Sequence, residues 1–324
     1  MKNTASKRTL AAVISLALAA SLTACAPMNS DTRRSDTESE LLSEVFPETD
    51  AELRDDEENI ETTVTAEEIT EISASYITRE NDKWKFFEFD GNHSKKIDIE
   101  NADSLEVKSN ELCLSDFEYS PNVEVLVIGE LSSNDLSGIE NFPNIKRLKI
   151  DQGTHISDIS DIVKCQNIEI LTFHLTDPAN DYSYLGELVN LKKLRVILTG
   201  DDNDKEYKAI NIESISSCQN LEVLALQHFY MDNMDFLKPL KNLKTLNYMT
   251  TCQESMDISP LLGMEKLEEL VITHYNSDDI SVFLRLDSLK RLEIYGDEYS
   301  QESIDKLNEA FSDRKIEIDN GHNI

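Results

Sequence analysis

Apolar positions beyond Pro121 recur in blocks, and within each block they alternate with other residues at a period of two. In the first block, Leu126 and Ile128 are separated by one residue, which places both side chains on one face of a strand. Successive central leucines are 22, 23, 23, 30, 22, 24 and 22 residues apart. They are Leu126, Leu148, Leu171, Leu194, Leu224, Leu246, Leu270 and Leu292. Such a period predicts a solenoid, in which neighbouring repeats stack to bury their apolar faces.

A second element lies thirteen residues before each central leucine and reads, in its commonest form, Asp-Ile-Ser. Its first positions are Cys113, Asp135, Asp158, Asp181, Asn211, Asn233, Asp257 and Asp279. Because Asp, Asn and Ser cap free backbone N–H groups, we expect a short turn or single helical turn on the outer side of each repeat. A Ca²⁺ site along this column is the alternative, since carboxylates suit that cation. Turn capping is the favoured interpretation.

The strand unit itself reads Asn-Leu-x-x-Leu-x-Leu, as in Asn190-Leu-Lys-Lys-Leu-Arg-Val196. Together with the upstream element, this unit resembles the leucine-rich repeats of bacterial internalins over about 113–294. The resemblance implies an α/β solenoid, an arc with a parallel β-sheet on its concave face. The position five residues after each central leucine never holds Asn, so the internal asparagine ladder of many such repeats is absent.

Each end of the solenoid is expected to carry a cap, because a bare end would expose the core. At the start, Trp84 to Phe89 and Lys96 to Ile99 are predicted to form a β-hairpin around 90–92, with 105–107 a degenerate first repeat. At the far end, a helix following Ser300 and a strand through Ile316 are predicted. The predicted domains are an N-terminal cap at 76–112, about eight repeats at 113–298, and a C-terminal cap at 299–324.

The N-terminus has the pattern of an export signal. Lys2, Lys7 and Arg8 precede an uncharged apolar run from Leu10 to Leu22, which is too short for a spanning helix of roughly 20 residues. The run ends in Leu-Thr-Ala-Cys25, which resembles the lipobox of bacterial lipoproteins. The resemblance implies a signal peptide at 1–24, lipidation of Cys25, and anchoring at the extracytoplasmic face of the cell membrane.

Charge divides the remainder into two parts. The chain has 63 acidic and 31 basic residues, for a net charge of −32, which argues against nucleic acid as a partner. Residues 26–75 contain sixteen acidic and three basic residues, so 25–75 is predicted to be a lipidated Cys followed by a disordered acidic tether. Residues 76–324 have a net charge of −22.

Catalytic, metal and disulfide chemistry find little support in the sequence. Cys165 and Cys218 fall two repeats apart, roughly 10 Å, which is beyond disulfide reach, and we expect both to be buried thiols. The histidines are similarly spread, so a zinc site is not expected, and no catalytic motif is present. We predict no cofactor and no enzymatic activity. The long interval of 30 residues indicates an insertion at about 199–208, which is interpreted as a surface loop with ligand or Ca²⁺ binding left open.

Binding is instead predicted on the concave face, from residues that flank the central leucines and point away from the core. The candidates are Arg147, Lys149, Thr172, His174, Lys193, Arg195, Asn247, Thr273, Arg291 and Tyr295. Lys146 and Lys192 adjoin the basic members. A basic, partly apolar stripe suits an acidic protein or an anionic glycan. The sequence therefore favours a surface-exposed binding module, with a structural lipoprotein that organises neighbouring envelope proteins as the alternative.

Overall fold

The computed structural model describes residues 74–151, 156–175, 181–198, 207–208, 210–231, 233–250, 256–273, 275, 277–296 and 299–319. They belong to one compact unit, Ala74–Ile324. The predicted signal peptide, Cys25 and nearly all of the tether lie outside the described residues. The same holds for Cys252, His155, His274 and His322, and for 199–206 of the predicted insertion.

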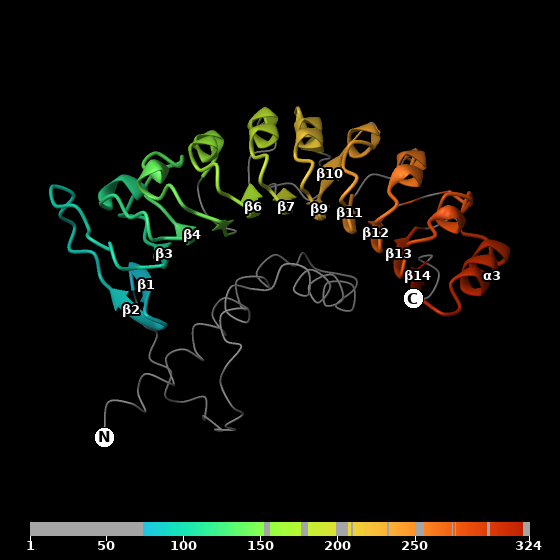
Figure 1. Ribbon diagram of the computed structural model, residues 1–324, viewed down its shortest axis with the longest axis horizontal. Coiled ribbons are helices and arrows are strands. Elements are labelled where there is room, and N and C mark those ends of the chain that lie inside the picture. The colour runs from blue at the N-terminus through green and yellow to red at the C-terminus, as the bar shows by residue number, and fades with distance from the viewer. Residues whose placement is uncertain are drawn as a thin grey trace, which may run out of the picture. The chain divides into compact units, whose positions relative to one another are not determined.

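A single sheet of 12 strands runs through the described part of the chain (Figure 1). Its order is β14-β13-β12-β11-β9-β7-β6-β5-β4-β3-β1-β2, with neighbours parallel from β3 to β14 and β1 antiparallel to both β2 and β3. The strands are β1 (Tyr76–Glu80), β2 (Lys83–Phe87), β3 (Ser104–Lys108), β4 (Val125–Glu130), β5 (Arg147–Ile150), β6 (Ile170–Leu175), β7 (Lys193–Leu198), β9 (Val223–Gln227), β11 (Thr245–Met249), β12 (Glu269–Thr273), β13 (Arg291–Tyr295) and β14 (Lys315–Asp319).

The register of the sheet follows the central leucines. Leu126 pairs with Leu148, and each later central leucine pairs with its equivalent on the next strand. All eight are at most 1% exposed. Leu105 on β3 and Ile316 on β14 extend the same row at its two ends. The predicted solenoid is confirmed, and 105–107 takes part in it as a first repeat.

Short 3₁₀ helices on the outer side of the solenoid connect one strand to the next (Figure 1). They span Leu114–Asp116, Ile139–Asn141, Ser160–Lys164, Ser183–Glu187, Ile212–Ser217, Asp235–Leu237, Ser259–Gly263 and Phe283–Arg285. The predicted capping precedes them: Asp158 Oδ1 accepts the Ser160 N–H at 2.8 Å. Asp135, Asp181, Asn233, Asp257 and Asp279 accept equivalent bonds. These bonds confirm the capping role at six of the eight positions, whereas Asn211 donates to Asp181 Oδ1 at 2.9 Å and the Cys113 N–H donates to Asp116.

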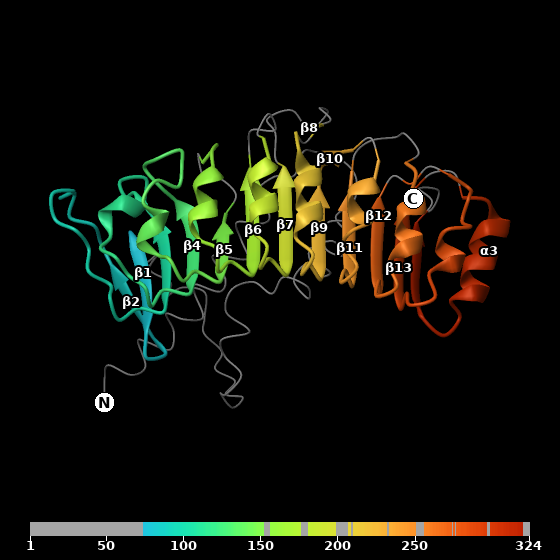
Figure 2. The same ribbon diagram turned by 45° about the horizontal axis from the view of Figure 1, so that its top comes forward.

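A second, two-stranded sheet accompanies the long interval between repeats. It consists of β8 (Tyr207–Lys208) and β10 (Phe229–Tyr230), which pair in parallel. Figure 2 shows both beyond the carboxyl end of β9, where β10 follows that strand directly. The end of the insertion is therefore joined to the following repeat by backbone hydrogen bonds.

The N-terminal hairpin exists, but it lies earlier in the chain than predicted. It joins β1 to β2 through Asn81 and Asp82, whose φ angles are 50° and 58°, the left-handed conformation that two-residue hairpins require. The predicted strand at 96–99 is wrong, since Ile97 makes an isolated bridge with Phe117 instead. The sequence predicts the turn at 90–92, which contains Gly91. Asn and Asp also tolerate a positive φ, and Asn81 and Asp82 form the turn of the hairpin.

At the far end, helix α3 (Gln301–Ala310) and β14 lie where the sequence predicts a helix and a strand. The side chain of Ser300 accepts the Ser303 N–H and so caps α3. Leu307 and Phe311 are buried against the core. Within the described ranges, no helix is both long enough and apolar enough to cross a membrane.

The first helical turn is secured by a small polar cluster around Asp116. One carboxylate oxygen accepts the Cys113 N–H at 2.9 Å, and the other lies 2.9 Å from Nδ1 of His93. Burial alone would raise the pKa of Asp116, but hydrogen bonds from Cys113 and His93 outweigh it and hold this pKa below 3.8. The ionised carboxylate is therefore favoured in the folded protein.

This shift predicts a pH-dependent stability. A lowered folded pKa contributes stability that is present above pH 3.8 and is lost as the pH falls through the folded value. We expect Asp116→Asn to be less stable than wild type near pH 7, and the difference to close below about pH 4. Urea denaturation at several pH values measures it. Asp287→Asn, an exposed control, should show no such convergence, and a pH-independent difference for Asp116→Asn would contradict the assignment.

Candidate concave binding face

The candidate site is the side of the sheet opposite the 3₁₀ helices, here called the concave face (Figure 1). Along each strand, the residues next to the central leucine point to this face, because side chains alternate. On β5, for example, Leu148 and Ile150 are fully buried in the core, whereas Arg147 and Lys149 are half-buried on the other side. The face is therefore formed by rows of side chains that cross the strands in register.

All ten residues predicted from the sequence lie on strands, at positions of the concave face. Arg147 and Lys149 are on β5, Thr172 and His174 on β6, Lys193 and Arg195 on β7, Asn247 on β11, Thr273 on β12, and Arg291 and Tyr295 on β13. The structure thus brings them together as two groups, β5–β7 and β11–β13, with β9 between them.

The first group is basic. Arg147, Lys149, Lys193 and Arg195 form what we call the basic cluster. Arg147 and Lys193 flank Ile170 in one row, and Lys149 and Arg195 flank Thr172 in the next, with members of a row about 10 Å apart across two strand spacings. Lys149 Nζ lies 2.9 Å from Asp151. The cluster thus places four basic side chains on neighbouring strands of a unit whose net charge is strongly negative.

His174 lies beside the basic cluster and differs from it in charge. Burial, reinforced by the positive charges of Arg195 and Lys149, lowers its pKa to about 3. The imidazole is therefore neutral near pH 7. Its Nδ1 has no hydrogen-bond partner among the described residues. His174 can offer a neutral hydrogen-bonding group to a ligand, but not a charge.

The second group is polar and largely compensated within itself. Arg291 Nε and Nη2 each lie 2.7 Å from Oε1 of Glu293. The Tyr295 hydroxyl is 3.4 Å from the other carboxylate oxygen, and Thr273 donates to the Thr250 carbonyl at 2.9 Å. Arg291, one of the ten residues predicted for the binding face, is thus paired with Glu293. Glu293 is absent from the residues predicted from sequence, although its position beside Leu292 marks it as concave.

A separate polar edge runs along the starts of the strands, two residues before each central leucine. Its residues alternate in charge: Glu124, Lys146, Glu169, Lys192, Glu222, Lys244, Glu268 and Lys290. Each lysine pairs with the glutamate of the preceding repeat, at 2.7 Å for Lys146–Glu124 and 2.7 Å for Lys192–Glu169. Lys146 and Lys192, which the sequence placed beside the basic cluster, therefore belong to this compensated edge and not to the concave face.

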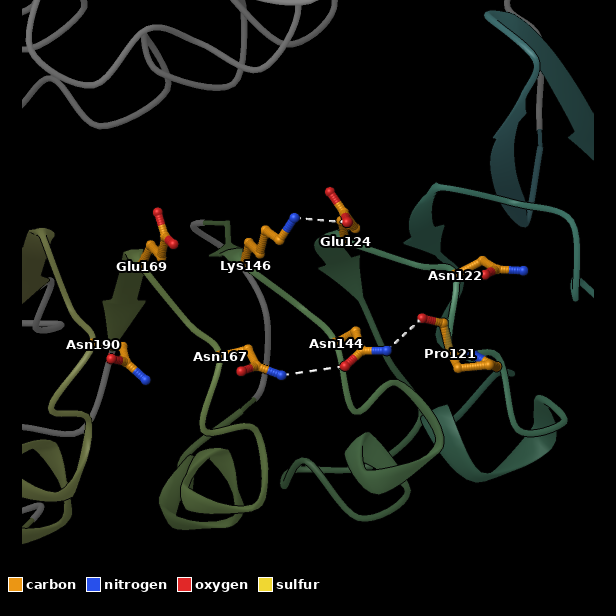
Figure 3. A pocket seen from close by; sticks show the side chains of 8 residues that line it. All are labelled: Pro121, Asn122, Glu124, Asn144, Lys146, Asn167, Glu169 and Asn190. Atoms are coloured by element: carbon orange, nitrogen blue, oxygen red, sulfur yellow. Dashed lines mark hydrogen bonds and ion pairs between the residues drawn. The ribbon is translucent and has the colours of Figure 1, made fainter.

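Figure 3 shows the asparagines that accompany this edge. Asn144 donates to the carbonyl of Pro121 at 2.9 Å, and Asn167 donates to Asn144 Oδ1 at 3.2 Å. Asn190, Asn220 and Asn242 donate in the same way to carbonyls of the preceding repeat. The Asn of the strand unit thus ties repeats together at the surface, in a solenoid whose sequence lacks the internal ladder.

Two of the described cysteines lie in the core of the solenoid. Cys165 and Cys218 are free and fully buried, and their thiols face backbone carbonyls. Burial raises the pKa of each to about 11, so neither is a reactive thiolate near pH 7. In the part of the chain that the structure describes, no three His, Cys, Asp or Glu side chains are grouped to hold a metal ion.

Comparison with known proteins agrees with this architecture. An internalin from Listeria monocytogenes superposes with a TM-score of 0.50 at 18% identity, over 64% of this chain and 57% of that protein. The fold is that of an internalin-type leucine-rich-repeat solenoid. The chain thus spans little more than half the length of that internalin. Internalin C2 from the same organism gives a TM-score of 0.47 at 21% identity, over 60% of this chain and 81% of that one.

A plant peptide hormone receptor, RGFR1 in complex with RGF2, gives a TM-score of 0.40 at 16% identity, over 60% of this chain and 31% of that one. No family model matches the sequence, and no curated protein matches it. The likeness therefore concerns the fold.

Proposed function

We propose that the chain is a binding module that captures a protein ligand on its concave face. The observation that carries the proposal is the basic cluster, which places four cationic side chains on one face of a unit with a net charge of −22. An acidic partner approaching this molecule is repelled by most of its surface and attracted to this patch, so charge both orients and selects the partner.

The rigidity of the face supports the same function. Its side chains stand on strands whose register is fixed by the buried central leucines. Residues held in this way lose little conformational freedom when a ligand binds, so less free energy of association is lost to ordering. The proposed role requires no catalytic group.

We further propose that the module is exported and held at the cell surface by lipid on Cys25. The support is the sequence: a basic start, an uncharged apolar run and Leu-Thr-Ala-Cys25 in direct succession. The acidic segment 26–75 would then act as a spacer, with an end-to-end distance of roughly 40 Å for a flexible chain of this length. Mass spectrometry of the membrane-extracted protein tests this step, and an unmodified Cys25 would contradict it.

Site-specific cross-linking tests the binding proposal. We expect a photo-reactive residue at Ile170, in the middle of the basic cluster, to cross-link a protein from the cell exterior. The same residue at Val189, which is 50% exposed on a turn outside the concave face, is the matched control and should give little product. Equal yields from both positions would reject the concave face, and adducts that carry glycan without protein would replace the protein ligand by an anionic glycan.

A further inference from the structure

Asn247 is the unusual residue of the concave face. It lies on β11 and is 2% exposed, and neither Oδ1 nor Nδ2 has a hydrogen-bond partner among the described residues. A buried amide without partners costs free energy, because both its donors and its acceptor have lost water. A native protein usually satisfies such a group, so its presence on a binding face calls for a physical reason.

The surroundings of Asn247 explain why the solenoid cannot satisfy it. Its cross-strand neighbours are Ala225 on β9 and Val271 on β12, and neither side chain has a polar atom. The backbone on both sides is engaged in the sheet. Met249, next on the same face of β11, already accepts a hydrogen bond from Gln227 at 2.9 Å. Asn247 stands at a concave position of β11, and none of the described residues offers its amide a hydrogen bond.

Neighbouring polar side chains of the face behave differently. Thr273 is bonded to the backbone of Thr250 through both its donor and its acceptor function, at 2.9 Å each. Glu293 is bonded to Arg291 at 2.7 Å. The sheet thus satisfies these polar residues on β12 and β13, whereas both polar side-chain atoms of Asn247 lack a partner among the described residues.

We propose that Asn247 binds the main chain of the protein ligand, as an extended segment that crosses β7, β9 and β11. This inference rests on the proposed function. A side-chain amide has donors and an acceptor side by side, so it can pair with the N–H and C=O of a peptide group in the same way that two strands pair. These hydrogen bonds recognise the main chain of the ligand and do not depend on its side chains. They therefore suit a ligand that is recognised through its extended conformation.

The same row sets the chemistry of the ligand next to that peptide group. Arg195 on β7 lies two strands from Asn247, with Ala225 between them, a separation of about 10 Å or about three residues of extended chain. The ligand is therefore an extended segment with an acidic residue about three positions from the peptide group held by Asn247.

The first test compares stability with affinity. Linear random peptides, displayed on phage and long enough to cross β7, β9 and β11, are selected on the mature protein. Asn247→Leu, which keeps the volume but removes the amide, is expected to raise the melting temperature by about 2–4 °C and to weaken a selected peptide by about tenfold. Thr273→Val, which removes a satisfied hydroxyl, is the control and should lower the melting temperature.

The second test locates the contact on the ligand. A scan that N-methylates each peptide bond of the selected peptide should find one position that weakens binding to wild type but causes no further loss with Asn247→Leu. An acidic residue should lie about three positions away. A lower melting temperature for Asn247→Leu, unchanged affinity, or additive losses would each overturn the inference.

The two proposals fail separately. If no peptide is selected while the Ile170 cross-links persist, the protein ligand stands and the role of Asn247 is rejected. If the cross-links are absent as well, both are rejected.

Discussion

Replacing Gly138 by alanine is expected to lower the free energy of unfolding by about 3–5 kcal/mol. Gly138 has a φ of +99°, and an added Cβ would lie 2.3 Å from the backbone nitrogen of Ser115 and 2.6 Å from its Cα. Both atoms belong to the main chain of the preceding repeat, so no flexible side chain can move aside. The substitution would force apart two stacked turns of the solenoid, and equilibrium denaturation in urea measures the loss.

Gly91 provides the control for this prediction. Its φ is +77°, but an added Cβ would meet nothing within 4 Å, so Gly91→Ala measures the cost of the left-handed backbone alone, about 1 kcal/mol. We expect Gly138→Ala to lower the free energy of unfolding more than Gly91→Ala does, because its Cβ also collides with the backbone of the preceding repeat. Equal losses at the two positions would show that contact with Ser115 does not limit how closely the repeats pack.

Repetition made most of the fold predictable from the sequence. One strand unit and one turn element, each repeated at a fixed offset, leave a single register in which every central leucine is buried, and a slip of one residue would expose the whole apolar row. The hairpin was misplaced because it occurs once. Its turn at Asn81 and Asp82 carries no glycine, and no second copy was available to correct the interpretation.

The sequence predicted the candidate site only to the extent that side chains alternate between the two faces of a strand. Alternation placed Arg147 and Lys193 on the concave face correctly, but it could not show that Lys146 pairs with Glu124. That partner lies 22 positions away and becomes adjacent only through stacking. The isolation of Asn247 was hidden for the same reason, since it depends on Ala225 and Val271 in two other repeats.

The edge and the face supply a closely matched experiment on the proposed function. Arg147 and Lys193 point to the concave face, whereas their sequence neighbours Lys146 and Lys192 pair with glutamates at the strand starts. The variant Arg147→Glu with Lys193→Glu and the variant Lys146→Glu with Lys192→Glu change the net charge equally. Any difference between them therefore reports where a charge lies, and not how much charge the molecule carries.

We expect the concave variant to bind the protein ligand at least 100-fold more weakly, because charge pairs at an interface contribute about 1.5 kcal/mol or more each and reversal adds repulsion. Adding Lys149→Glu and Arg195→Glu should abolish binding. The edge variant should lose less than about threefold, since exposed ion pairs contribute little. Titration by calorimetry measures all three, and wild-type affinity should fall with salt more steeply than that of the concave variant. Equal losses for edge and face would mean that general charge, and not the basic cluster, attracts the ligand.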